Sequence, residues 1–306
     1  MKSERKIPDS LFKLVGSPVP VLMFHSVCIP CSKPEREWYI GPEQFLRFIA
    51  WLAEWGYQSL TPMEWVAGKK LPRHVILTFD DGYDDFYTEA FPVLERFGLS
   101  ATVFVVVDRI GKSNNWDHKL GYRSRRLLTL QEIRELHRHG VAFGSHSLTH
   151  PFLTLLSDED LRCEVSDSKS RLEDLLGSEV TCFAYPGGRV DPCVRAAVAD
   201  AGYKTAMSVR HGLNFSEDPL WMKRINVSEN DSQLRFTLKV LSGRTVPQHM
   251  FEWLVRGMRA GLDVLPDPLS RALEPRIRKV YRLASERWSR WTESRRFPPV
   301  REGSLR

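Results

Sequence analysis

The sequence predicts an α/β protein in which about seven parallel strands, connected by helices, form a barrel. Short apolar runs rich in β-branched residues alternate along the chain with longer segments whose apolar residues recur every three or four positions. Strands that are separated by helices in the chain tend to pair in parallel, with helices covering both faces of the sheet. The 306 residues and the 42% hydrophobic content suffice for one large folded domain with an appendage.

The expected elements follow one another between residues 18 and 207. Apolar residues predict the first strand at 18–27, and apolar residues at helical spacing predict the first helix at 42–55. Further strands are expected at residues 75–79, 101–107, 141–145, 181–185 and 203–207. Further helices are expected at residues 86–97, 129–139, 157–176 and 191–200, and the first three are followed by the stop signals Gly98, Gly140 and Gly177.

Charge divides the chain into a near-neutral body and a basic C-terminal part. Residues 244–306 contain fourteen Lys and Arg against seven Asp and Glu, so this part carries +7 and the rest of the chain −1 of the net +6. A near-neutral body argues against the broad cationic surface that nucleic acid binding needs. We therefore predict an N-terminal extension at 1–17, a main domain at 18–245 and a basic helical extension at 246–306.

The basic extension has the pattern of an amphipathic helix. From Leu269 onwards apolar residues recur at three- or four-residue spacing with Arg and Glu between them, and the apolar side includes Trp288 and Trp291. Such a helix can lie on an anionic membrane surface, and packing against the main domain is the alternative. If it binds a membrane, the substrate could be a lipid-linked sugar at the inner face.

The N-terminus predicts no secretion signal, because residues 1–6 are charged and Pro18 and Pro20 interrupt the next apolar stretch. No stretch approaches eighteen uncharged apolar residues. Five cysteines are an odd number and do not resemble a disulfide framework. The predicted location is the cytoplasm, with peripheral contact at the inner membrane face left open. Cys28 and Cys31 form a C-x-x-C pair that we interpret as incidental loop thiols, with redox sensitivity as the alternative.

Carboxylates and imidazoles follow two of the predicted strands. Asp80 and Asp81 come directly after the strand at 75–79, and because neighbouring strand residues point to opposite faces, one could bind a metal while the other acts as a base. His146 and His150 follow the strand at 141–145 and are close enough in the chain to bind one ion. The carboxyl ends of parallel strands meet at one edge, so the pattern indicates a metal hydrolase.

Three segments resemble the first three motifs of the polysaccharide deacetylases, carbohydrate esterase family 4. These segments are residues 78–83 (TFDDGY), 146–151 (HSLTHP) and 183–188 (FAYPGG). The resemblance covers roughly residues 18–245, which it makes the catalytic domain. It implies a distorted (β/α) barrel that removes N- or O-acyl groups from sugars with a divalent metal, commonly zinc, with cobalt, manganese or nickel as alternatives.

The resemblance also implies roles for individual residues. Asp80 would be the general base, and Asp81, His146 and His150 the metal ligands. Gly187 would donate its backbone N–H to the developing oxyanion. Substrate contacts are expected from Tyr185, Pro186 and Trp116.

Two positions depart from the family pattern. Ala184 stands where many members carry an Arg that braces the catalytic Asp, so the brace is expected from Arg189 or Arg210, or is missing. The late Leu-x-His motif, which supplies the general acid in many members, is absent after Met207. His25 resembles the histidine of members in which that motif has moved to the first strand, and we predict that it is the general acid. A core histidine bonded to the backbone is the alternative.

The predicted protein is a hydrolase of carbon–nitrogen bonds other than peptide bonds. It would remove an acyl group, most simply N-acetyl, from an amino sugar in a saccharide or a lipid-linked sugar. Hydrolysis of another small amide, such as a formamide, is an alternative, and a catalytically silent carbohydrate-binding protein is another.

Overall fold

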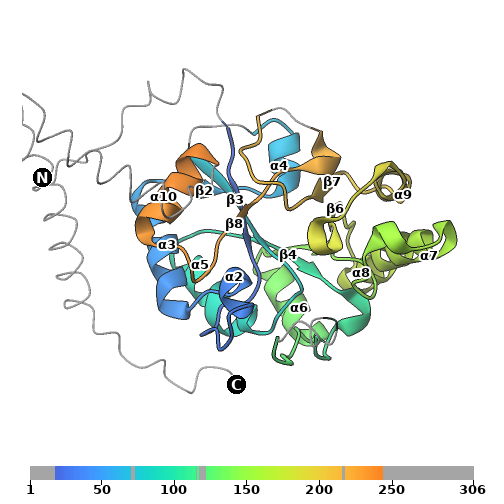
Figure 1. Cartoon of the computed structure of the whole chain (residues 1–306), viewed down its shortest axis with the longest axis horizontal. Helices are drawn as coiled ribbons and strands as arrows, with labels where there is room; N and C mark the ends of the chain where they lie inside the picture. The colour runs from blue at the N-terminus through green and yellow to red at the C-terminus, as the bar shows by residue number, and fades with distance from the viewer. Residues whose placement is uncertain (1–17, 70–72, 115, 117–121, 216–217, 244–306) are drawn as a thin grey trace, which may run out of the picture. The chain divides into compact units, whose positions relative to one another are not determined.

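A computed structural model describes residues 18–69, 73–114, 116, 122–215 and 218–243, which form a parallel sheet surrounded by helices (Figure 1). Within these residues the strand order is β7-β6-β5-β4-β3-β1-β8, and β2 pairs with β3. All of these strand pairs are parallel. The strands are β1 (Val21–Phe24), β2 (Gln58–Ser59), β3 (His74–Phe79), β4 (Thr102–Val105), β5 (Ala142–Ser145), β6 (Cys182–Ala184), β7 (Thr205–Met207) and β8 (Ile225–Asn226). The predicted α/β fold, a distorted (β/α) barrel, is confirmed.

A short segment between β7 and β8 connects the two ends of the strand order. Met222 forms a parallel bridge with Met207 at the end of β7, and Ile225 pairs with Leu22 of β1. In Figure 1 the orange β8 accordingly lies beside the dark blue β1. Within the described residues, the bridge at Met222 and the short β8 span this gap in place of a long strand, and the barrel is distorted there. The same segment places Arg224 inside the barrel with none of its surface exposed.

Helices lie around the sheet, and all but α2, α4 and α10 lie at positions that the sequence predicts. They are α2 (Glu35–Trp38), α3 (Pro42–Glu54), α4 (Pro62–Val66), α5 (Phe91–Arg96), α6 (Leu130–Arg138), α7 (Asp158–Arg162), α8 (Ser168–Leu176), α9 (Pro192–Asp200) and α10 (Gln233–Ser242). Local signals set their ends: Thr129 and Glu132 form a reciprocal capping box at the start of α6, and Gly177 adopts the left-handed conformation after α8.

Two of the predicted helices contain a π-helical turn that the sequence pattern did not reveal. The first, η1 (Phe86–Ala90), precedes α5, and the second, η5 (Cys163–Asp167), separates α7 from α8. Such turns are rare and often occur at functional sites. The first predicted strand is also shorter than expected, because β1 ends at Phe24 and the chain then turns into the loop that carries His25.

Aromatic packing fixes the ends of β1 and β3 to each other. The ring of Phe24 stacks on that of Phe79 with centroids 5.1 Å apart, and Phe45 and Phe86 meet these rings edge-on. Burial of each such side chain stabilises the fold by roughly 1.5–3 kcal/mol. The loops that follow the two strands therefore start from fixed positions.

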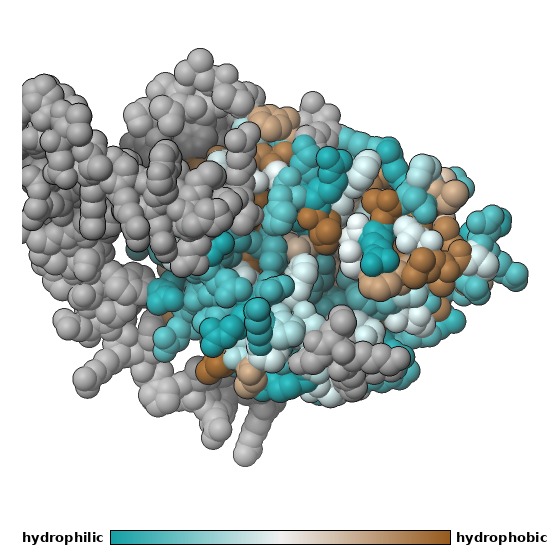
Figure 2. All heavy atoms as spheres, viewed as in Figure 1, coloured by the Kyte–Doolittle hydropathy of each residue, from teal (hydrophilic) through white to brown (hydrophobic). Residues whose placement is uncertain are grey.

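The described surface in the view of Figure 2 is mostly hydrophilic, with hydrophobic side chains gathered in the right half of the picture. Phe152 and Leu155 are among the exposed large hydrophobic residues, at 44% and 72% of their surface. None of the described helices combines the length and hydrophobicity that a membrane crossing requires. The predicted extensions at 1–17 and 246–306, and with them the amphipathic basic helix, lie outside the described residues.

Candidate active site

The three predicted metal ligands come together at the carboxyl edge of the sheet. Asp81 follows β3, His146 follows β5, and His150 lies in the loop after His146. Oδ1 of Asp81 lies 3.6 Å from Nε2 of His146 and 3.5 Å from Nε2 of His150. One candidate ligand atom from each residue lies within 4.8 Å of the other two, so the cluster could hold a metal ion.

The chemistry of this donor set fits a divalent cation. Nδ1 of His146 lies 2.8 Å from the carbonyl oxygen of Ala184, and donation of the Nδ1 proton to that oxygen leaves the Nε2 lone pair directed at the cluster. Burial lowers the pKa of His146, and burial together with the charge of His146 lowers the pKa of His150 well below its usual value. Both rings are therefore neutral at pH 7. A carboxylate and two neutral imidazoles are a common ligand set for zinc.

The backbone around the cluster is held in an uncommon conformation. Asp81, Ser147 and His150 have φ angles of 70°, 65° and 69°, a region that side chains other than Gly rarely adopt. Hydrogen bonds support the loop, because Oγ of Ser147 accepts from the backbone N–H of His150 at 3.0 Å and Oγ of Ser145 accepts from that of Ser147 at 3.1 Å. The surrounding fold therefore imposes the ligand positions.

The second carboxylate, Asp80, forms a buried ion pair with Arg224. Nη1 and Nη2 of Arg224 donate to the two carboxylate oxygens at 2.6 and 2.7 Å, and Nε donates to the carbonyl oxygen of Ser208 at 2.9 Å. Burial raises the pKa of Asp80, but the charges of Arg224 and His146 and the hydrogen bonds from Arg224 outweigh it and hold the pKa well below its usual range. Asp80 is therefore ionised and fixed in orientation.

The expectation that Arg189 or Arg210 braces Asp80 is wrong. The guanidinium carbon of Arg189 lies 4.2 Å from the ring centroid of Phe152, and that of Arg210 lies 5.0 Å from the ring centroid of Trp221. Arg224 supplies the brace from the segment that joins the barrel ends. In the sequence, two basic residues, Lys223 and Arg224, stand between apolar residues 222 and 225, but no strand is predicted beyond residue 207.

His25 follows β1 and belongs to the same edge. Its ring meets that of Trp38 at 64° with centroids 4.9 Å apart, and its buried Nδ1 has no hydrogen-bond partner among the described residues. Burial lowers the pKa of His25 to about 4, against an opposing effect of Asp80 and with smaller contributions from Arg224 and His146. The imidazole thus interacts electrostatically with Asp80, Arg224 and His146, and it is neutral at pH 7.

The predicted substrate contacts differ in exposure. The indole of Trp116 stacks on the His150 ring, with centroids 4.7 Å apart and 26° between the planes, so it forms a wall beside the cluster. Tyr185 and Pro186 are buried, and the Tyr185 hydroxyl donates to the carbonyl oxygen of Leu220 at 2.8 Å. Their side chains pack in the interior below the turn that contains Gly187, and they are not exposed to a substrate.

Gly187 lies in the short turn η6 (Pro186–Gly188) directly after β6. It is exposed and has a φ of 60°, and a Cβ atom at this position would lie 2.6 Å from the ring of Phe152. Gly188 has a φ of 66°, and a Cβ atom there would collide with Val209. Only glycine fits at either position without strain, so the turn keeps its backbone accessible.

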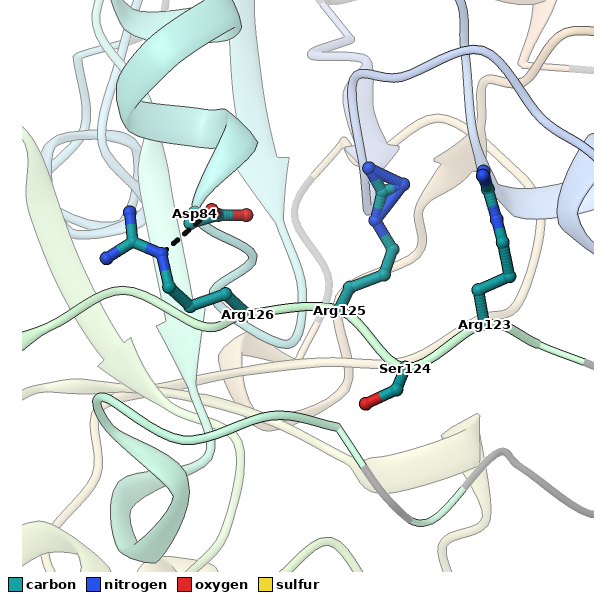
Figure 3. Close-up of a pocket in the computed structure, with 5 residues that line it drawn as sticks. All are labelled: Asp84, Arg123, Ser124, Arg125 and Arg126. Carbon is teal, nitrogen blue, oxygen red and sulfur yellow. Dashed lines mark hydrogen bonds and ion pairs between the residues drawn. The ribbon is translucent and has the colours of Figure 1, made fainter.

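A cavity of about 260 Å³ lies elsewhere among the described residues, and none of the proposed metal ligands lines it. In Figure 3 Arg126 reaches Asp84, whereas Arg123 and Arg125 extend away from that pair. The residues that line it are Asp84, Arg123, Ser124, Arg125 and Arg126. Carboxylates already pair with these cations: Glu35 with Arg123, Asp85 with Arg125, and Asp84 and Glu132 with Arg126. The cavity therefore does not indicate an anion site.

The C-x-x-C pair lies in the loop after His25. Cys31 is exposed, whereas burial raises the pKa of the half-buried Cys28 thiol to about 11. Because the thiolate is the reactive form of cysteine, this environment favours the interpretation of incidental thiols over a redox-active pair.

Comparisons with known proteins agree with this geometry. The family model described as polysaccharide deacetylase matches residues 67–206. YxkH of Bacillus subtilis (strain 168), named after the same family, is 30% identical over 224 residues, which cover 71% of this chain and 74% of that protein. Poly-β-1,6-N-acetyl-D-glucosamine N-deacetylase of Staphylococcus aureus (strain N315) is 23% identical over 215 residues, 65% of this chain and 71% of that one.

Among solved structures, the deacetylase PplD of Streptococcus pyogenes in complex with acetate superposes with a TM-score of 0.62 at 26% identity, covering 76% of this chain and all of that one. The matched region contains the strands that carry the Asp-His-His cluster and the ion-paired Asp80. From the similarity to YxkH over most of both chains, and from the agreement in fold, the chain belongs to the polysaccharide deacetylase family and is a hydrolase of carbon–nitrogen bonds other than peptide bonds.

Proposed function

We propose that the protein is a metal-dependent deacetylase that removes an N-acetyl group from an amino sugar in a saccharide or a glycolipid. The observation that carries this proposal is the cluster of Asp81, His146 and His150 beside a second, ionised carboxylate, Asp80. The cluster would hold a divalent cation, most simply zinc, with cobalt, manganese or nickel as alternatives. When bound there, such an ion lowers the pKa of a coordinated water and polarises the acyl carbonyl.

The chain itself would supply the proton transfers and the positioning. Asp80 accepts the proton of the attacking water, and Arg224 keeps its carboxylate ionised and aimed. The backbone N–H of Gly187 stabilises the negative charge that develops on the acyl oxygen. His25 then protonates the leaving amine. Because the pKa of His25 is lowered to about 4, it carries this proton only after receiving it during the reaction, and the proton that Asp80 has accepted from the water, passed on to His25, supplies it.

The substrate class follows from the family and the rim of the site. The Staphylococcus aureus relative is named for deacetylation of poly-β-1,6-N-acetyl-D-glucosamine, which makes β-1,6-linked N-acetylglucosamine oligosaccharides the first substrates to test. Trp116, at the wall of the cluster, offers an aromatic surface on which a sugar ring could stack. Peripheral membrane contact and a lipid-linked substrate stay predictions, because they depend on residues 246–306. A cytoplasmic location also stays a prediction, because no described feature bears on it.

Acetate release from a panel of N-acetylated oligosaccharides should depend on a divalent metal. We expect dialysis against a chelator to abolish release and zinc or another divalent ion to restore it, measured by a coupled acetate assay. Ammonia release from formamide, measured separately, tests the alternative of small-amide hydrolysis. Oligosaccharide binding without turnover at any metal concentration would contradict the proposal and favour the silent carbohydrate-binding protein.

Replacement of His25 by Ala should lower kcat by about 10²- to 10⁴-fold, the usual contribution of a general acid. Metal affinity should not change, because His25 is not one of the three clustered ligands. The matched control is His139→Ala, which removes an exposed imidazole at the end of α6. Turnover that matches the control would remove His25 from the mechanism and leave it as a core histidine.

A further inference from the structure

We propose that Glu164, in the π-helical turn η5, is a positioning residue that holds the loop of the two histidines in its metal-binding conformation. This inference rests on the proposed function, because it assigns Glu164 a part in metal binding by Asp81, His146 and His150. Glu164 itself is not in the ligand cluster and acts through the loop.

The Glu164 carboxylate binds the middle of that loop with three hydrogen bonds. Its Oε2 accepts from the backbone N–H groups of Leu148 and Thr149, each at 2.9 Å. Its Oε1 accepts from the Thr149 hydroxyl. Two consecutive backbone amides and a side chain are thus bound to one carboxylate from a segment fifteen residues further along the chain.

These bonds act where the loop needs support. Ser147 and His150, on either side of the bound pair, have φ angles of 65° and 69°. Each such conformation in a residue other than Gly costs roughly 1–3 kcal/mol and persists only when the surroundings enforce it. Because Leu148 and Thr149 lie between them, the Glu164 carboxylate fixes the part of the chain that sets the separation of His146 and His150.

The π-helical turn itself is anchored to the strand that precedes His146. Oγ of Ser145, the last residue of β5, donates to Oγ of Ser168 at 2.8 Å, and Oγ of Ser168 donates to the carbonyl oxygen of Val165 at 2.9 Å. The Tyr203 hydroxyl donates to the same carbonyl oxygen at 3.3 Å. The Val165 carbonyl oxygen thus accepts hydrogen bonds from two side-chain hydroxyls, as expected in a π-helical turn, where the regular α-helical hydrogen bonds are interrupted. Glu164 is therefore held relative to β5 independently of its own contacts with the loop.

In the described part of the chain no Lys or Arg forms an ion pair with Glu164. Two other acidic residues of the same helical segment have partners elsewhere: Asp160 binds Ser157 at the start of α7, and Glu173 pairs with Lys169. The Glu164 carboxylate is thus directed at the loop alone, as expected of a group that orients ligands from outside the ligand shell.

The test is the affinity of the full chain for zinc, measured by competition with a chromogenic chelator. Outer-shell partners of metal ligands typically contribute 10- to 100-fold in affinity, and we expect a loss of that size for Glu164→Ala. Glu164→Gln keeps an acceptor oxygen for the two amides but presents a donor to Thr149, so we expect an intermediate loss. Glu159→Ala, which removes an exposed carboxylate from α7, is the control for the change in charge.

Unfolding in urea without metal separates this role from a purely structural one. A structural role would lower the stability of the metal-free variants and leave the zinc affinity of the folded protein unchanged, and that result would overturn the inference. If Glu164→Ala does not fold, the same comparison is made with Glu164→Gln and with Thr149→Val. A wild-type chain that binds none of zinc, cobalt, manganese and nickel would overturn the proposed function as well, whereas equal affinities of wild type and variants would overturn only the role of Glu164.

Discussion

Replacement of Asp80 by Asn is expected to lower the rate of acetate release by about 10²- to 10⁴-fold while the folded protein still binds metal. Asn has the shape of Asp but cannot accept a proton from the attacking water. Asp80 is also separate from the cluster of Asp81, His146 and His150, so the ligands remain. Single-turnover acetate release and zinc affinity, measured on the same preparation, distinguish the two effects.

Two matched variants frame this result. Asp81→Asn should weaken zinc binding together with turnover, because it removes the carboxylate from the cluster. Asp84→Asn, which changes a carboxylate paired with Arg126 in the same loop, should leave both near the wild-type values. Full turnover in Asp80→Asn would show that another group, or solvent, accepts the proton.

Replacement of Arg224 by Leu is expected to destabilise the metal-free protein by about 3–5 kcal/mol, the usual effect of removing one partner of a buried ion pair. The Asp80 carboxylate would remain buried without the two charged hydrogen bonds that it receives. The double variant Asp80→Asn, Arg224→Leu should recover a large part of the loss, because no uncompensated charge is left inside. Urea unfolding of the two single variants and the double variant measures the coupling between the residues.

The deficit of Arg224→Leu should shrink as the pH falls from 7 to about 4. In the wild type the pKa of Asp80 is lowered, so the stabilising ion pair is present above the ordinary pKa near 4 and is lost only as the pH falls through the lower folded value. In the variant the charge and hydrogen bonds of Arg224 no longer oppose burial and that pKa rises, so the penalty is greatest above the raised value and disappears as Asp80 becomes protonated. A deficit that stays constant over this range would indicate lost packing instead of an unpaired charge.

The strands, helices and the main cluster could be predicted because their signals are local. Asp80 and Asp81 follow an apolar strand, and the two histidines are four residues apart after another, so parallel pairing alone brings them to one edge. The brace could not be predicted in this way. β8 has two residues, too few to show a periodicity, and the pairing of Arg224 with Asp80 spans 144 residues.

The π-helical turns were missed for a related reason. A single wide turn inside a helix changes the phase of the apolar residues by about one position, which a pattern of three- and four-residue spacings absorbs. The segment at 157–176 is therefore predicted as one helix. In the structure η5 interrupts it, and Glu164 in η5 binds the loop between His146 and His150. Contacts between such segments depend on tertiary structure and leave no trace in a local pattern.

The closure of the barrel by its final strand has a consequence for biosynthesis. Asp80 is synthesised 144 residues before Arg224, with which it pairs. The separation between Leu22 and its strand partner Ile225 is larger still. Contacts between positions so distant in the chain form late, after shorter-range structure is in place. A nascent or truncated polypeptide that ends before Arg224 thus contains every proposed metal ligand and yet lacks the counter-ion of its base, so that catalytic competence arrives only with the completed domain.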